Sequence, residues 1–227
     1  MARAAVDGDE FLLHVVHDLR AHLRQSLSRA EMLDRSMGDT LEEHNKSHLV
    51  AVLDANRSLD RFLRRLADYC RAGSSMDGRT NVNAEFLIDN AIRASGIDKL
   101  DPAPSVVTSG EFAEVKAPAC LQKVLVELLD NAAKFRSEGS GSEIEVRVDQ
   151  VNSSLELSVK DNGIGFEPDS AEVIFQPLER LHGVGVYPGF GFGLAICQRI
   201  VSSLNGRIWA ESQPDQGALF RASIPVH

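Results

Sequence analysis

The sequence predicts an α+β protein in which an antiparallel helical hairpin precedes a two-layer sandwich of helices packed on a β-sheet. Apolar residues recur with helical spacing in the N-terminal third, and helical patterns alternate with short strand-like patterns after it. Between these regions, Arg71–Asn81 is rich in glycine, serine and polar residues, which is typical of a linker. We therefore expect a helical hairpin at residues 1–72, a linker at 73–81 and a second domain at 82–227.

Two apolar stripes at a/d-like spacing predict the two helices of the hairpin, the first from Phe11 to about Arg35. The stripes consist of Leu12, Val16, Leu19, Leu23, Leu27 and Ala30, and of Leu49, Val52, Asn56, Leu59, Leu63, Leu66 and Cys70. Thr40 followed by Glu43 predicts a capping box that opens the second helix. Because two helices alone bury little apolar surface, we expect a dimeric four-helix bundle. The alternative is a hairpin packed on the second half of its own chain.

The C-terminal region shows the local patterns of helices and strands in alternation. We expect helices near Ala84–Ser95, Ala119–Phe135 and Gly191–Leu204. We expect strands near Ser105–Ser109, Glu143–Gln150 and Leu155–Lys160 and in the final pair GRIWAES and ALFRASIPV. The stretch Asp161–Pro188 has no regular pattern. Since it exceeds the ~12–15 residues of a passive loop, it favours a lid or a binding loop.

Composition argues against several classes of function. The chain has 227 residues, 43% of them apolar and 25% charged, as in ordinary globular proteins. Its net charge of -9 argues against nucleic-acid binding and against anionic membranes. No apolar run approaches the ~18–20 residues that span a bilayer, and the N-terminus lacks the apolar segment of a signal peptide. We expect a cytoplasmic protein without membrane insertion, with Cys70, Cys120 and Cys197 as buried thiols.

The predicted helix that ends in VELLDNAAKF carries three polar side chains on one face. Glu127, Asn131 and Lys134 stand at i, i+4 and i+7, and at 3.6 residues per turn they project in similar directions. An amide oxygen can bind magnesium and an ammonium group can bind phosphate, so this face suits a magnesium–triphosphate. The alternative is a solvated face that carries a Glu–Lys pair.

Two glycine-containing stretches follow. DNGIGF places Asp161 at the end of a predicted strand, just before Gly163 and Gly165. Such an aspartate can accept a hydrogen bond from the amino group of a base while the backbone passes close beneath the ring, although Asp-Asn-Gly is by itself a good turn. YPGFGFGLAI places Gly189, Gly191 and Gly193 before a predicted helix, where backbone N–H groups at the N-terminus can hold phosphates.

In this order, the stretches ELLDNAAKF, DNGIGF, IFQPLERLHG and YPGFGFGLAI resemble the catalytic half of sensor histidine kinases. That half has the Bergerat ATP-binding fold, which gyrase, mismatch-repair and chaperone ATPases share. HDLRAHLR (His17–Arg24) resembles the phosphoacceptor box of the same family. The segment RLHG…YPG is especially similar to the kinase module of phytochrome-type sensors. The resemblance covers residues 10–226.

The resemblance implies roles for individual residues. His17 would be the phosphoacceptor and Asp18 the acid that orients or deprotonates it. Asn131 would hold Mg²⁺, Lys134 would contact phosphate, and Asp161 would accept the adenine amino group. His17 also lies roughly 120° from the centre of the apolar stripe, so its ring should face solvent, where an imidazole is a competent nucleophile.

The remaining implied residues are the glycines and one acid. Gly163 and Gly165 would let the base lie close, and the array would hinge the lid and approach the phosphates; it consists of Gly189, Gly191 and Gly193. Glu127 would assist catalysis or only pair with Lys134. The other histidines have no second ligand at a useful spacing and are assigned no metal: His14, His22, His44, His48 and His182.

Three positions depart from the family pattern. His22 stands where the family usually has a proline that kinks the helix, so we expect a straighter helix. Phe175 and Pro177 keep the lid motif, but Leu178 replaces its second phenylalanine. Phe190 stands where a Thr or Ser hydroxyl usually helps to close the lid on phosphate. Together these changes are expected to affect catalytic turnover more than nucleotide binding.

We therefore expect a homodimeric, ATP- and Mg²⁺-dependent histidine kinase that autophosphorylates on His17 and then transfers the phosphoryl group to an aspartate of a response-regulator receiver domain. No receiver or sensor is evident, so the chain is either an excised core or a small kinase controlled by an upstream sensor or regulatory partner. One alternative is a histidine phosphotransfer or docking dimer with a weakened or vestigial ATP-binding domain. Another is a simple ATPase or serine kinase, which has no use for His17.

Overall fold

The computed structural model describes residues 2–37, 39–73, 79–110, 114–137, 141–183 and 186–225. The chain divides into two compact units, residues 1–71 and 72–227. Most of the expected linker, residues 74–78, lies outside the described residues.

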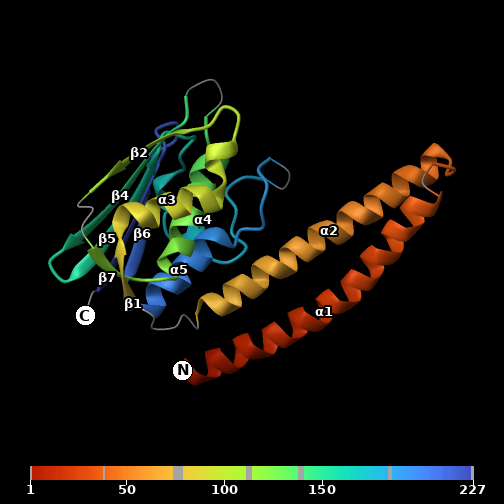
Figure 1. Ribbon diagram of the computed structural model, residues 1–227, viewed down its shortest axis with the longest axis horizontal. Coiled ribbons are helices and arrows are strands. Elements are labelled where there is room, and N and C mark those ends of the chain that lie inside the picture. The colour runs from red at the N-terminus through yellow and green to blue at the C-terminus, as the bar shows by residue number, and fades with distance from the viewer. Residues whose placement is uncertain are drawn as a thin grey trace. The chain divides into compact units, whose positions relative to one another are not determined.

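The N-terminal unit is an antiparallel pair of long helices, α1 (Ala2–Met37) and α2 (Glu43–Ala72), which lie side by side in Figure 1. α1 continues without a break through His22. The core between the two helices contains Val16 and Leu23 from α1, packed with Leu63 and Ala67 from α2. Each fully buried leucine or valine stabilises such a contact by about 1.5–3 kcal/mol relative to exposure.

Only part of the predicted apolar stripes is buried between these two helices. Leu12 and Leu19 of α1 are 39% and 50% exposed, and Val52 and Leu59 of α2 are each 48% exposed. Leu53, which the predicted stripe omitted, is buried instead. Each helix thus presents a second apolar stripe to solvent, because a single partner helix covers only part of its apolar face.

The predicted capping box was wrong. The hydroxyl group of Thr40 donates a 2.9 Å hydrogen bond to the carbonyl of Met37, so it satisfies the end of α1. α2 begins at Glu43 itself, and the Lys46 N–H donates to the Glu42 carbonyl. Glu43 therefore stands at the first helical position and not at the third, where a capping box requires it.

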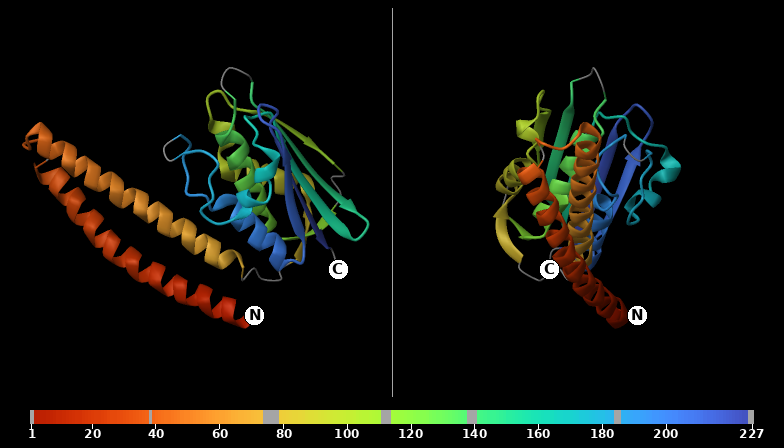
Figure 2. Two further views of the ribbon diagram at one scale, coloured as in Figure 1. Left: turned by 180° about the vertical axis from the view of Figure 1, so that it is seen from behind. Right: turned by 90° about the vertical axis from the view of Figure 1, so that its right-hand side faces the viewer.

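The C-terminal unit is built on a five-stranded sheet with the order β2-β4-β5-β7-β6. The strands are β2 (Ser105–Ser109), β4 (Glu143–Val151), β5 (Ser154–Asp161), β6 (Arg207–Ser212) and β7 (Ala218–Pro225). β2 pairs in parallel with β4, and the other neighbours pair antiparallel. Three helices cover one face of the sheet (Figures 1 and 2): α3 (Ala84–Ser95), α4 (Leu121–Lys134) and α5 (Gly193–Ser203). The predicted two-layer α+β architecture is confirmed.

The core lies between this sheet and these helices. Alternate residues of each strand face the helices and are buried: Ile144, Val146 and Val148 of β4; Leu155, Leu157 and Val159 of β5; and Phe220, Ala222 and Ile224 of β7. The helices contribute Leu125, Leu128 and Leu129 of α4 and Ile196 and Ile200 of α5. This period-two burial is what the alternating sequence pattern predicted.

A second, two-stranded sheet was missed. β1 (Arg79–Asn83) pairs antiparallel with β3 (Glu114–Pro118), so the expected linker 73–81 includes the first residues of a strand. Three 3₁₀ turns were also missed: η1 (Ile97–Lys99), η2 (Pro168–Ser170) and η3 (Val173–Phe175). Across the described residues, no helix has both the length and the apolar character needed to cross a bilayer. Cys70 and Cys197 are buried as expected, whereas Cys120 is half-buried.

Candidate functional site

His17 projects from the exposed side of α1. Its side chain is 77% exposed and that of Asp18 is 81% exposed. The Nδ1 atom of His17 and the Oδ1 atom of Asp18 lie 3.3 Å apart. This carboxylate can hold the imidazole in the tautomer that leaves Nε2 with a lone pair, and it can stabilise the ring once it carries a positive charge.

One turn beyond His17, an ion pair joins the two helices. Arg20 of α1 donates from Nε to Oδ1 of Asp60 in α2 at 3.0 Å, and Arg64 donates to Oδ2 of the same carboxylate at 2.6 Å. Burial raises the pKa of Asp60, but the hydrogen bonds and charges of Arg64 and Arg20 outweigh burial, so the net pKa lies below its ordinary value. The pair fixes the register of α1 against α2 close to His17.

The C-terminal end of α4 brings the glycine-containing stretches together. The carbonyl of Phe135, the residue that ends α4, accepts a 2.9 Å hydrogen bond from the N–H of Ile164. A Cβ atom on Gly163 would collide with the same carbonyl. A Cβ atom on Gly189 would lie 3.3 Å from Nζ of Lys134. Lys134, the DNGIGF loop and the glycine array therefore meet at one place.

Asp161 is held at the end of β5 by backbone donors. Its Oδ1 atom accepts hydrogen bonds from the N–H groups of Gly163 at 2.9 Å and Ala218 at 3.2 Å. The residue is only 8% exposed, and burial raises the pKa of its carboxyl, while the two backbone hydrogen bonds lower it less. A buried carboxylate held in this way can accept a further hydrogen bond from a ligand amino group.

The loop after Asp161 passes closely over its neighbours. Gly165 has a φ of +61°, and a Cβ atom there would collide with the carbonyl of Gln213. Gly217, which sequence reasoning missed, leaves equally little room against the carbonyl of Asp161. The absence of a side chain at Gly165 and Gly217 lets these backbone segments approach each other closely.

The segment between β5 and α5, residues 162–192, is called the lid segment below. Gly191 has a φ of +75°, and its carbonyl accepts a 2.9 Å hydrogen bond from the N–H of Leu178. A Cβ atom on Gly191 would lie 2.6 Å from the carbonyl oxygen of Glu179. Gly193 is the first residue of α5, and Phe192 before it is buried. The glycine array thus leads into a helix N-terminus, where backbone donors are available to an anion.

Lys134 is the cation nearest to the glycine array in the contacts above, and its environment favours ligand binding. Burial lowers the pKa of Lys134, and the like charge of Arg180 in the lid segment lowers it further. Its Nζ atom lies 4.3 Å from the centre of the Phe135 ring. Two neighbouring cations repel each other in the absence of a ligand, and an anion that binds between them stabilises the charged form of both.

An aromatic group at the same end of α4 was missed by sequence reasoning. The ring centres of Phe135 and Tyr187 are 4.9 Å apart, and His182 lies 5.1 Å from Tyr187 and 5.9 Å from Phe135. Arg180 donates a 2.8 Å hydrogen bond to the carbonyl of Tyr187. The sequence shows His182 in RLHG and Tyr187 in YPG, but the packing of these two rings against Phe135 is a long-range contact that no local pattern contains.

Glu127 does not lie on a solvated face. It is 3% exposed, and its carboxylate forms a 3.0 Å ion pair with Lys123, one turn earlier in α4. The proposed pairing with Lys134 is therefore not needed to satisfy its charge. Asn131 and Lys134 are half-buried on the same helix.

The residues present fit a nucleotide and its magnesium ion. Among the described residues no group of three or more His, Cys, Asp or Glu is arranged to hold a metal. Mg²⁺ usually takes only one or two protein ligands and fills its shell with substrate phosphates and water, so one amide such as that of Asn131 suffices.

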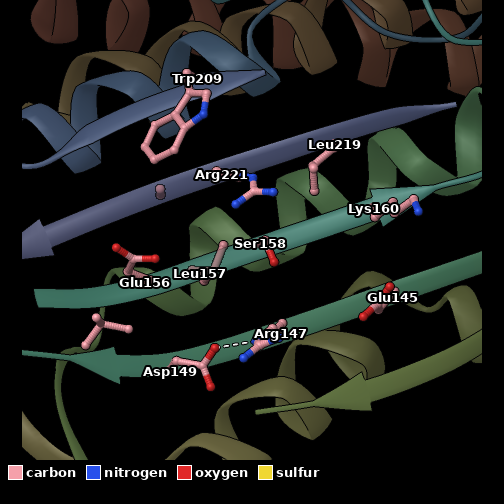
Figure 3. Close-up of a pocket in the computed structure, with 12 residues that line it drawn as sticks. Glu145, Arg147, Asp149, Glu156, Leu157, Ser158, Lys160, Trp209, Leu219 and Arg221 are labelled. Atoms are coloured by element: carbon pink, nitrogen blue, oxygen red, sulfur yellow. Dashed lines mark hydrogen bonds and ion pairs between the residues drawn. The ribbon is translucent and has the colours of Figure 1, made fainter. Parts of the chain in front are cut away.

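A pocket on the outer face of the sheet is separate from the site described above. Figure 3 shows that charged side chains of β4 and β5 line it together with Trp209 and Arg221. Arg147 pairs with Asp149 along β4, and Arg221 lies 3.8 Å from Glu211. Of the described residues that line this pocket, none belongs to the motifs described above. It is a charge-paired sheet surface that shares none of its described residues with the site above.

Several known proteins are similar to this chain in sequence. Residues 117–227 match the family of histidine kinase-, DNA gyrase B- and HSP90-like ATPases. The whole chain aligns with the phytochrome-like protein Cph1 of Synechocystis at 27% identity over 30% of that protein. Of this chain, 92% aligns with the sensor protein KdpD of Escherichia coli at 30% identity, over 23% of that protein. The chain thus spans less than a third of these two relatives.

Solved structures show the same fold. Full-length ShkA, crystallised in complex with AMPPNP, superposes with a TM-score of 0.71 at 21% identity, over 95% of this chain and 45% of that chain. The histidine kinase AdeS of Acinetobacter baumannii superposes with a TM-score of 0.58 at 19% identity, over 91% of this chain and 98% of that chain.

Proposed function

The chain matches the catalytic core of sensor histidine kinases, and from this premise we propose that it transfers the γ-phosphoryl group of ATP to His17. The observation that carries the proposal is the convergence at the end of α4. There Lys134 lies against Gly189, and Phe135 binds the loop that follows Asp161.

Each of these groups has a task in nucleotide binding. The buried carboxylate of Asp161 accepts the adenine amino group, and the absence of a side chain on Gly163 lets the base lie against the loop. Lys134 and the N–H groups that begin α5 at Gly193 bind phosphate oxygens. Asn131 holds Mg²⁺, which neutralises charge on the phosphates.

The transfer step itself needs little from the protein beyond alignment. The Nε2 lone pair of His17 forms a bond to the γ-phosphorus while the bond from that phosphorus to the bridging oxygen breaks, and ADP leaves. The imidazole, now positively charged, loses its Nδ1 proton to Asp18 or to solvent. The 3.3 Å separation of Nδ1 and Oδ1 supports this role for Asp18. Glu127, paired with Lys123, acts as a positioning residue.

We further propose that the chain acts as a homodimer and passes the phosphoryl group to an aspartate of a response-regulator receiver domain, under an upstream sensor or regulatory partner. The second apolar stripe supports dimerisation, because Leu12, Leu19, Val52 and Leu59 are all substantially exposed in the single chain. A four-helix bundle made by two hairpins would cover this stripe.

The test is autophosphorylation with γ-labelled ATP and Mg²⁺. The chain should acquire an acid-labile, base-stable phosphate that His17→Gln abolishes, whereas the matched change of another exposed α1 histidine, His22→Gln, should leave labelling in place. Label that persists in His17→Gln would contradict the assignment of the phosphoacceptor. A chain that takes no label from ATP but takes it from a phosphorylated receiver domain would be a phosphotransfer module instead.

A further inference from the structure

The first turns of α2 carry two histidines that no part of the proposed kinase reaction uses. His44 and His48 stand at i and i+4, which places both rings on one face of the helix. Both residues are exposed. The sequence alone indicated no second metal ligand for either histidine, but at helical spacing each of the two can serve as the second ligand of the other.

The two Nε2 atoms lie close enough together to share one metal ion. Their Nε2 atoms lie 3.1 Å apart, and the ring planes cross at 85° with centres 4.4 Å apart. Two imidazole nitrogens that each lie about 2.0–2.1 Å from one metal ion, at a bond angle of about 90–109°, are about 2.8–3.4 Å from each other. The observed separation falls inside this range, so the spacing of the two nitrogens suits a shared ion.

We propose that His44 and His48 bind one divalent transition-metal ion of the class that prefers imidazole, such as Ni²⁺, Cu²⁺ or Zn²⁺. The inference does not depend on kinase activity. Among the described residues no third His, Cys, Asp or Glu joins the pair, so water completes the coordination shell. Binding requires a lone pair on both Nε2 atoms, so the ring that donates the present hydrogen bond changes to the Nδ1–H tautomer.

The surroundings favour a cation. Residues 39–48 contain Asp39, Glu42 and Glu43 and one lysine, Lys46, which gives three negative charges against one positive and a net charge of -2. These acids offset the positive end of the α2 dipole. Imidazole ligands discriminate against Mg²⁺, which prefers oxygen, so the ion that accompanies ATP should not compete for this site.

The experiment measures Ni²⁺ binding to the full chain, produced without a histidine tag and without nucleotide, by calorimetry. The wild-type chain should bind Ni²⁺, Cu²⁺ more tightly and Co²⁺ more weakly. His44→Ala and His48→Ala should each weaken binding by at least the about 10–100-fold that loss of an outer-shell partner costs a metal site. The α1 variant His22→Ala should bind as the wild type does.

The sharpest control moves one ring to another face of the helix. The double substitution Lys46→His with His48→Lys keeps the composition and the charge but separates the two histidines to i and i+2, which do not face each other. It should lose the binding, and Ni²⁺ should raise the thermal midpoint of the wild type but not of this variant. Unchanged Ni²⁺ affinity in this variant, or equal protection by Mg²⁺, would overturn the proposal.

Discussion

The backbone N–H of Leu178 donates a 2.9 Å hydrogen bond to the carbonyl of Gly191, so the turn that carries the family departure is tied to the glycine array. Gln176, Pro177, Leu178 and Glu179 form that turn, closed by a 3.3 Å hydrogen bond from the Glu179 N–H to the Gln176 carbonyl. Leu178 has a φ of +70°. With proline at the second position, this φ at the third is that of a type II turn, which favours glycine there.

Leu178→Gly should therefore stabilise the C-terminal unit. The left-handed backbone costs a non-glycine residue about 1–2 kcal/mol, and glycine returns about 0.5–1 kcal/mol of this through the greater entropy of the unfolded chain. We expect the free energy of unfolding to rise by about 0.5–1 kcal/mol, measured by urea denaturation. Leu181→Gly, at an exposed position without positive φ, should lower it; the same sign in both variants would reject the strain argument.

Asp161→Asn should weaken ATP binding without unfolding the protein. The amide oxygen can still accept hydrogen bonds from the N–H groups of Gly163 and Ala218, but the negative charge that we propose for binding the adenine amino group is lost. A hydrogen bond to a charged group contributes about 1.5–3 kcal/mol, which corresponds to about 10–150-fold in the dissociation constant. Calorimetric titration with ATP and Mg²⁺ checks this, with Asp169→Asn, at an exposed position in the lid segment, as control. An undiminished affinity would remove Asp161 from the site.

Phe190→Thr should raise the rate of autophosphorylation, because it places a hydroxyl group between Gly189 and Gly191 that can bind phosphate. The measurement is the initial rate of labelling at saturating ATP. Phe192→Thr is the contrasting change: Phe192 is 2% exposed, so its loss should instead cost about 3 kcal/mol or more of stability. A rate that stays equal or falls in Phe190→Thr would mean that this half-buried ring has a packing role of its own.

The ion pair between Arg20 and Asp60 predicts a pH dependence of the N-terminal unit. Because the pKa of Asp60 lies below its ordinary value of 3.8 in the folded state, the unfolded chain binds its proton first as the pH falls. The stabilisation is fully present above pH 3.8 and is lost as the pH falls through the folded pKa. Asp60→Asn should flatten the loss of stability in this acidic window, followed by circular dichroism; an unchanged slope would contradict the pair's contribution.

Local patterns in the sequence predicted most of the elements and named the candidate site residues. The bounds predicted for Ala84–Ser95 and Ser105–Ser109 coincide with α3 and β2, because helical and alternating periodicity are properties of neighbouring residues. The exposure of His17 was predicted from its position roughly 120° from the centre of the apolar stripe. The order of the motifs carried the family resemblance before any contact between them was known.

Tertiary structure decided what depends on distant partners. Val52 and Leu53 are adjacent apolar residues of α2, yet Leu53 is buried and Val52 is 48% exposed. Only the packing of the two helices decides between them. The pairing of β1 with β3 joins segments more than thirty positions apart. The bond from Leu178 to Gly191 closes a loop of 13 positions. Burial, loop closure and side-chain pairing are set by the whole fold, so a one-dimensional pattern names the candidates but not the contacts they form.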